Sequence, residues 1–170
     1  MSSRKIGASN SQSERLFTLI QFDDLLSMPD CLPDNQRHFV FFLALDATSI
    51  PDDLLSRLAR NLLRSGLINL VAWGPDCERV HDLFDSQRDF DETDETVIMT
   101  TWHADDSLKD VLWYFADLAV VADAYEGKTE WIAATPSNAT WNRELLSTLT
   151  RLAHRSFGAT VVVCPERAKD

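Results

Sequence analysis

The chain has 170 residues, a length that suits one domain of ordinary size. Hydrophobic residues make up 45% of it and charged residues 25%, so it can bury a core without a disulfide or a metal to support it. Its 27 acidic residues outnumber its 16 basic residues, and the formal net charge is −11. This balance argues against generic binding to nucleic acid or to an anionic membrane, which both depend on basic residues. It favours solubility and a basic protein partner.

The three cysteines, Cys31, Cys77 and Cys164, are scattered along the chain and form no CxxC pair. This spacing fits a reducing compartment better than a disulfide framework or a zinc site. The first apolar stretch, Leu16 to Leu26, is interrupted by polar residues and resembles neither a signal peptide nor a membrane span. We therefore expect a cytoplasmic protein with no membrane association.

The N-terminal part of the chain differs in composition from the rest. Residues 1–15 are rich in Ser, Asn and Gln and are expected to form a disordered tail. Residues 16–36 begin with an apolar run that fits either a strand or a helix and continue with Pro29 and Pro33 in loop sequences. We interpret them as an arm that packs on a single α/β domain spanning residues 37–170.

From Phe39 onward, predicted strands alternate with predicted helices. Residues 39–45 form a continuous, aromatic-rich apolar run, which is typical of a strand buried on both faces of a parallel sheet. A helix is predicted to start with Ser49 as its cap and to end at Ser65-Gly66. The later strands are predicted at residues 67–73, 97–102, 131–134 and 159–164, with residues 118–122 as a further strand candidate. The later helices begin near Asp76, Ser107 and Thr140.

This alternation predicts an α/β fold with three layers, in which a mostly parallel sheet of about five strands carries helices on both faces. Such an architecture is Rossmann-like or flavodoxin-like. The five glycines are too far apart for a GxGxxG or P-loop motif, and no GxSxG or HExxH motif occurs. We therefore expect no cofactor and no metal.

Ligands of open parallel sheets bind beyond the carboxyl ends of the strands. The candidate ligand-binding residues at these ends are Asp46, Trp73, Gly74, Asp76, Thr101 and Trp102. Since consecutive parallel strands point the same way, we expect Asp46, Cys77 and His103 to line one concavity. Gly74 has no side chain, so it could let its turn pass close to a ligand. Trp73 and Trp102 fit either an aromatic wall for a flat, nucleotide-like ligand or the packing of the core.

Cys77 and His103 are the candidate catalytic residues. Cys77 is expected in the first turn of a helix, where the helix dipole favours a thiolate, and His103 could act as its base from the next strand end. Asp76 and Glu78 flank Cys77 and disfavour a thiolate, and a lone cysteine at such a position is more often a packing residue. His103 could also bind a metal with the aspartates that follow it, but helix capping explains those aspartates without a metal.

The segment that covers the second helix and its exit is strongly acidic. Its candidate interaction residues are Asp82, Asp85, Asp89 and Glu92. These carboxylates fit a solvated helix face followed by a mobile loop, a surface that docks a basic protein, or a mimic of a phosphate backbone. If they dock a partner, association should weaken steeply with salt.

Two strings of the chain are distinctive, namely AWGPDC at residues 72–77 and MTTWH at residues 99–103. Together with Leu108 and Trp113, they make residues 38–115 resemble an uncharacterised family of small bacterial α/β proteins. The resemblance implies a bacterial origin and a compact α/β fold, and it implies no activity. It adds weight to the turns at Trp73 and Trp102 as a shared site.

Three functions remain open from the sequence. The first is a non-enzymatic binding or interaction module, such as a bacterial accessory protein of a defence or toxin–immunity locus, with a basic protein as its partner. The second is a small hydrolase or transferase with Cys77 as nucleophile and His103 as base. The third is a sensor of a small nucleotide-like ligand.

Overall fold

A computed structural model of the chain describes residues 4–6, 16–32, 38–87, 98–119, 129–156 and 158–163. The strands are β1 (Arg4–Ile6), β2 (Leu16–Phe22), β3 (His38–Ala44), β4 (Leu67–Trp73), β5 (Met99–His103), β6 (Thr129–Pro136) and β7 (Gly158–Val163). The helices are η1 (Met28–Cys31), α1 (Asp52–Arg64), α2 (Cys77–Ser86), α3 (Leu108–Trp113), the π-helical turn η2 (Tyr114–Leu118) and α4 (Asn142–Ser156).

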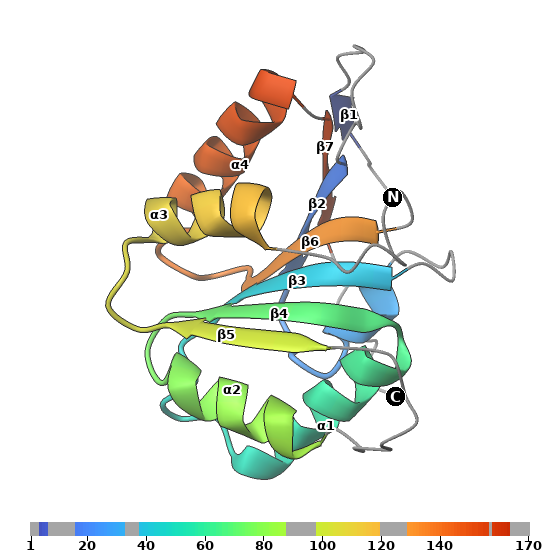
Figure 1. The fold of residues 1–170 in the computed structure, drawn as a ribbon, viewed down its shortest axis with the longest axis vertical. Helices are drawn as coiled ribbons and strands as arrows, with labels where there is room; N and C mark the ends of the chain where they lie inside the picture. The colour runs from blue at the N-terminus through green and yellow to red at the C-terminus, as the bar shows by residue number, and fades with distance from the viewer. Residues whose placement is uncertain are drawn as a thin grey trace.

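The strands form one sheet in the order β1-β7-β2-β6-β3-β4-β5 (Figure 1). Neighbouring strands are parallel except β1 and β7, which are antiparallel. Helices α1 and α2 cover one face of the sheet, and α3 and α4 cover the other. The predicted three-layer α/β architecture is confirmed, and the sheet holds more strands than the five expected.

The additional strands come from the N-terminal part of the chain. β2 does not belong to an arm on the surface, because it lies inside the sheet between β6 and β7. Phe17 and Leu19 of β2 face the α3–α4 layer, and Ile20 and Phe22 face the other layer, so this strand is buried on both faces. Residues 4–6 form β1 against β7, and the rest of the expected tail lies outside the described residues.

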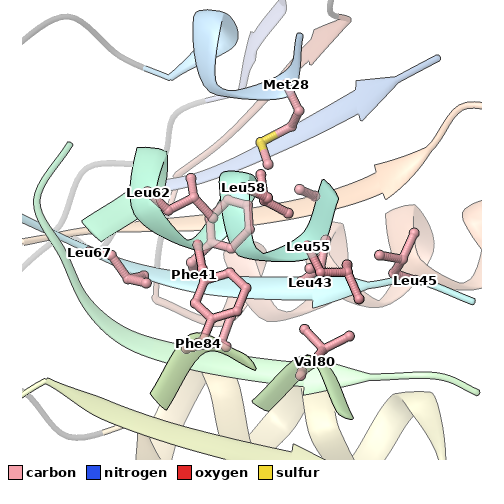
Figure 2. Close-up of a cluster of buried hydrophobic side chains, with 14 of the residues drawn as sticks. Met28, Phe41, Leu43, Leu45, Leu55, Leu58, Leu62, Leu67, Val80 and Phe84 are labelled. Atoms are coloured by element: carbon pink, nitrogen blue, oxygen red, sulfur yellow. The ribbon is translucent and has the colours of Figure 1, made fainter. Parts of the chain in front are cut away.

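β3 separates two hydrophobic cores. Phe41 and Leu43 face α1 and α2, where they meet Leu58 and Phe84 in the cluster shown in Figure 2. Phe42, on the opposite face of β3, packs instead among residues of α3, η2 and α4. The continuous apolar run of this strand therefore has the explanation that the sequence predicted, which is burial on both faces.

The helix starts differ in detail from those predicted. Helix α1 begins at Asp52 after Pro51, and no side chain caps it, so the predicted capping by Ser49 is wrong. Proline fits this position because its fixed φ suits the start of a helix, where N–H groups lack partners in any case. At α3 the cap is Ser107 and not the aspartates before it: the Ser107 hydroxyl accepts a hydrogen bond from the Asp110 N–H, at 3.2 Å.

Candidate functional site

The carboxyl ends of the parallel strands meet along one edge of the sheet. β3, β4 and β5 follow one another in space as they do in sequence, and the chain then crosses to β6 on the other side of β3. The boundary between β3 and β6 is therefore a topological switch point, the usual ligand position in such sheets. This edge holds the predicted residues that follow the strands, beginning with Asp46 after β3 and Gly74 after β4.

The loops after β3 and β4 are bound tightly to each other. The Leu45 N–H donates to the Trp73 carbonyl and the Ala47 N–H to the Pro75 carbonyl, both at 3.0 Å. Gly74 has a φ of +115°, and a Cβ at this residue would lie 2.4 Å from the Leu45 carbonyl oxygen. The missing side chain of Gly74 thus makes room for the backbone of the neighbouring loop, where the sequence had suggested a ligand.

Arg79 of α2 reinforces this contact between loops. Its guanidinium forms ion pairs with Asp76, at 2.6 Å, and with Asp52 at the start of α1, at 2.5 Å. It also donates hydrogen bonds to the carbonyls of Ile50 and Ala47. These carboxylates hold the pKa of Arg79 above its usual value, chiefly through the hydrogen bond to Asp76. Asp76, a predicted ligand residue, is therefore paired with another residue of the chain, although it lies at the surface.

Asp46 is exposed, but its carboxylate is used by its own turn. Oδ1 accepts hydrogen bonds from the Thr48 hydroxyl, at 2.6 Å, and from the Thr48 N–H, at 3.1 Å. The Thr48 hydroxyl is the main cause that lowers the pKa of Asp46. Such a closed turn is a common structural role for aspartate after a strand.

Cys77 lies at the start of α2 with its side chain in the core. The residue is 1% exposed and belongs to the cluster between the sheet, α1 and α2. Burial raises the pKa of the Cys77 thiol, so the neutral thiol is the favoured form. A buried, protonated cysteine is chemically inert compared with an exposed thiolate.

His103 faces the opposite side of the sheet. Its ring lies 4.8 Å from the ring of Tyr114, which follows α3, and its Nδ1 lies 2.8 Å from Asp106 Oδ2. Its Nε2 is buried and has no hydrogen-bond partner among the described residues. The structure therefore does not form the expected Cys77–His103 pair, because the two side chains lie on different faces of the sheet and the free nitrogen has no access to solvent.

The two tryptophans of the expected aromatic wall are also separated. Trp73 contacts Trp141 on the α4 side, with ring centroids 5.3 Å apart, and its Nε1 donates to the Asp106 carbonyl. Trp102 lies on the α2 side against His81, with centroids 4.5 Å apart. Thr101 of β5 donates a hydrogen bond from its hydroxyl to the Leu70 carbonyl of β4. Trp73 and Trp102 therefore do not form a wall for a flat ligand.

The acidic segment is described only in its first part, because Asp89 and Glu92 lie outside the described residues. On α2, Asp82 Oδ1 lies 3.0 Å from His81 Nδ1, and its side chain is 71% exposed. Asp85 accepts a hydrogen bond from the Thr100 hydroxyl, at 2.5 Å, which ties α2 to β5. These contacts bring two carboxylates, an imidazole and the exposed Trp102 together, and we call His81, Asp82, Asp85 and Trp102 the α2–β5 surface.

Two observations bear on metals and membranes. Among the residues that the structure describes, no three His, Cys, Asp or Glu side chains gather closely enough to hold a metal ion. No helix within the described ranges has the length and apolar character needed to cross a bilayer.

In a comparison with family models, residues 17–150 match a domain of unknown function (DUF7684). The chain belongs to this family. The match confirms the resemblance to an uncharacterised family and extends it, since it also includes β2 and most of α4. No curated protein and no solved structure matches the chain.

Proposed function

We propose that this DUF7684 protein is a non-enzymatic binding module that docks a basic segment of a partner protein on the α2–β5 surface. The observation that carries the proposal is Trp102, a large aromatic side chain that is 44% exposed on β5, the last strand in the order of the sheet. Tryptophan is among the residues that contribute most to protein interfaces, because it buries a large rigid surface at small entropic cost. The docking would suit the bacterial accessory role expected from the sequence.

The surroundings of Trp102 define the kind of partner. Its ring contacts His81, which in turn lies 3.0 Å from Asp82 and 3.7 Å from Asp85. An aromatic face next to carboxylates suits an arginine or lysine, because the cation can lie over the ring and pair with an acidic oxygen. The net charge of −11 adds long-range attraction for such a segment.

The strand-end residues support binding over catalysis. Cys77 is buried on one face of the sheet and the His103 ring lies on the other, so the imidazole cannot remove the proton of the Cys77 thiol. The loops that carry Asp46 and Asp76 are closed by hydrogen bonds within the protein. The polar groups at this edge thus act mainly as structural ties, which leaves the outer surface of α2 and β5 for recognition.

A nuclear magnetic resonance titration with a short arginine-rich peptide tests this proposal. The five tryptophans each give an indole N–H signal, which Trp→Phe variants assign. We expect the Trp102 signal to shift in a saturable way, and the shift to fade as salt rises from about 0.05 to about 0.5 M, because exposed charges are then screened. Trp113, which is 50% exposed on the other side of the sheet, is the internal reference.

Matched variants and a matched peptide control the titration. Asp82→Asn should weaken peptide binding, whereas Asp117→Asn, at an exposed position of η2, should leave it unchanged. A glutamate-rich peptide of equal length should not shift Trp102. The proposal fails if the basic peptide leaves Trp102 unaffected, or if both peptides shift it equally.

A further inference from the structure

A groove lies between α3 and α4, on the face of the sheet opposite to the α2–β5 surface. The two helices contact each other, and α4 lies beside β2 and β7 (Figure 1). The groove has a volume of about 240 Å³ and is lined by Lys109, Asp110, Trp113, Thr148, Arg151 and Leu152. We call it the α3–α4 groove, and no residue of the strand-end edge contributes to it.

The groove carries two cations in a chain where acids outnumber bases by 27 to 16. Within the described part of the chain, neither Lys109 nor Arg151 forms an ion pair with a carboxylate. Asp110 also lines the groove, and its carboxylate accepts the Ser107 hydroxyl, at 2.6 Å, so this one carboxylate is outnumbered by the two cations. The two cations are therefore available to an anion from outside.

Arg151 is held in position by the helix that bears it. Its Nη2 donates to the Thr148 hydroxyl, at 3.0 Å, and Thr148 is only 3% exposed. One hydrogen bond to a buried residue restricts the guanidinium and leaves its other N–H groups to bind an anion. A guanidinium fixed in this way loses less entropy on binding, and its planar fork suits a carboxylate or a phosphate.

Trp113 supplies an aromatic surface beside these cations. It is 50% exposed, the largest value among the exposed large apolar residues of the described chain. Leu152, across the groove on α4, is partly buried against the core below. An indole and a leucine side chain together favour a flat apolar group, because stacking on tryptophan buries area at a defined distance.

We propose that the α3–α4 groove binds a small aromatic anion, a single ring that carries a carboxylate or phosphate group. The ring stacks on Trp113, and the anionic group binds Arg151 and Lys109. The volume limits the ligand to this size, because pockets for larger organic ligands usually measure about 300–1,000 Å³. This site is independent of the proposed protein docking, since it uses other residues on the other face.

The test is a titration of the full chain with phenyl phosphate and with benzoate, followed by the Trp113 indole signal. Inorganic phosphate and benzyl alcohol provide the anion and the ring separately. We expect at least one aromatic anion to bind about tenfold more tightly than either separate part, because ring and charge act together. The site accepts either anionic group, so tight binding by either aromatic anion supports the proposal.

Variants locate the site. Arg151→Gln should weaken binding of the aromatic anion about tenfold, and Trp113→Ala, which lacks that indole signal and is titrated by calorimetry instead, should do the same. Arg143→Gln, at an exposed arginine of the same helix outside the groove, should change nothing. Unchanged urea midpoints show that the variants fold. The proposal is overturned if neither aromatic anion binds better than its parts, or if Arg143→Gln weakens binding as much as Arg151→Gln.

Discussion

Replacing Gly74 with alanine is expected to lower the free energy of unfolding by about 3–5 kcal/mol. Two costs add in this variant: the positive φ is unfavourable for any residue with a Cβ, and that Cβ would lie 2.4 Å from the Leu45 carbonyl oxygen. The backbone of the two loops must therefore move apart, which also strains the hydrogen bond from the Ala47 N–H to Pro75. Urea denaturation measures the change, with the midpoint as the observable.

Gly66→Ala is the control for this prediction. Gly66 has a comparable φ of +102°, so its substitution reports the cost of the dihedral angle, about 1–2 kcal/mol. The difference between the two variants then measures the contact with Leu45. Equal losses in the two variants would mean that the loops after β3 and β4 are not in the tight contact described.

The second large effect concerns the reactivity of Cys77. In a variant with Cys31→Ser and Cys164→Ser, the remaining thiol should react with an aromatic disulfide reagent about a thousandfold more slowly in the native protein than in urea. The thiol is 1% exposed and burial raises its pKa, so reaction must wait for an opening of the structure. The absorbance of the released thiolate gives both rates.

An exposed cysteine on the same helix calibrates that rate. Ser86→Cys, in a background without the natural cysteines, should react in the native state nearly as fast as in urea. His103→Ala should not slow the reaction of Cys77, because the imidazole lies on the other face of the sheet. The enzymatic hypothesis would be restored if native Cys77 reacted as fast as the cysteine of Ser86→Cys, or if His103→Ala slowed the reaction of Cys77.

The fold could be predicted from the sequence because its signals are local. The apolar run from Phe39 to Leu45 predicted a doubly buried strand, and the helices show one apolar face each. The position of β2 could not be predicted, since Thr18 and Gln21 interrupt its apolar pattern and strand order depends on contacts between distant segments. Only the folded chain brings β2 between β6 and β7 and so completes the sheet.

The candidate site was predicted less well than the fold, although the sequence contained part of the information that was needed. Trp102 and His103 are adjacent in a strand, so they must face opposite sides of the sheet. Cys77 precedes Val80 and Phe84 at helical spacing, which marks it as part of the buried stripe of α2. The role of Arg79 could not be predicted, because it depends on two loops that meet only in the folded chain.

The most direct test of the proposed function is a comparison of the partners that different variants retain from cells that produce the protein. The wild-type chain and Trp113→Ala should both capture a protein with a basic segment, and the variant with Trp102→Ala and Asp82→Asn should lose it. A loss of about 2 kcal/mol at Trp102, typical of a central interface residue, weakens binding about thirtyfold. Capture of the same partner by all three proteins would contradict docking on the α2–β5 surface.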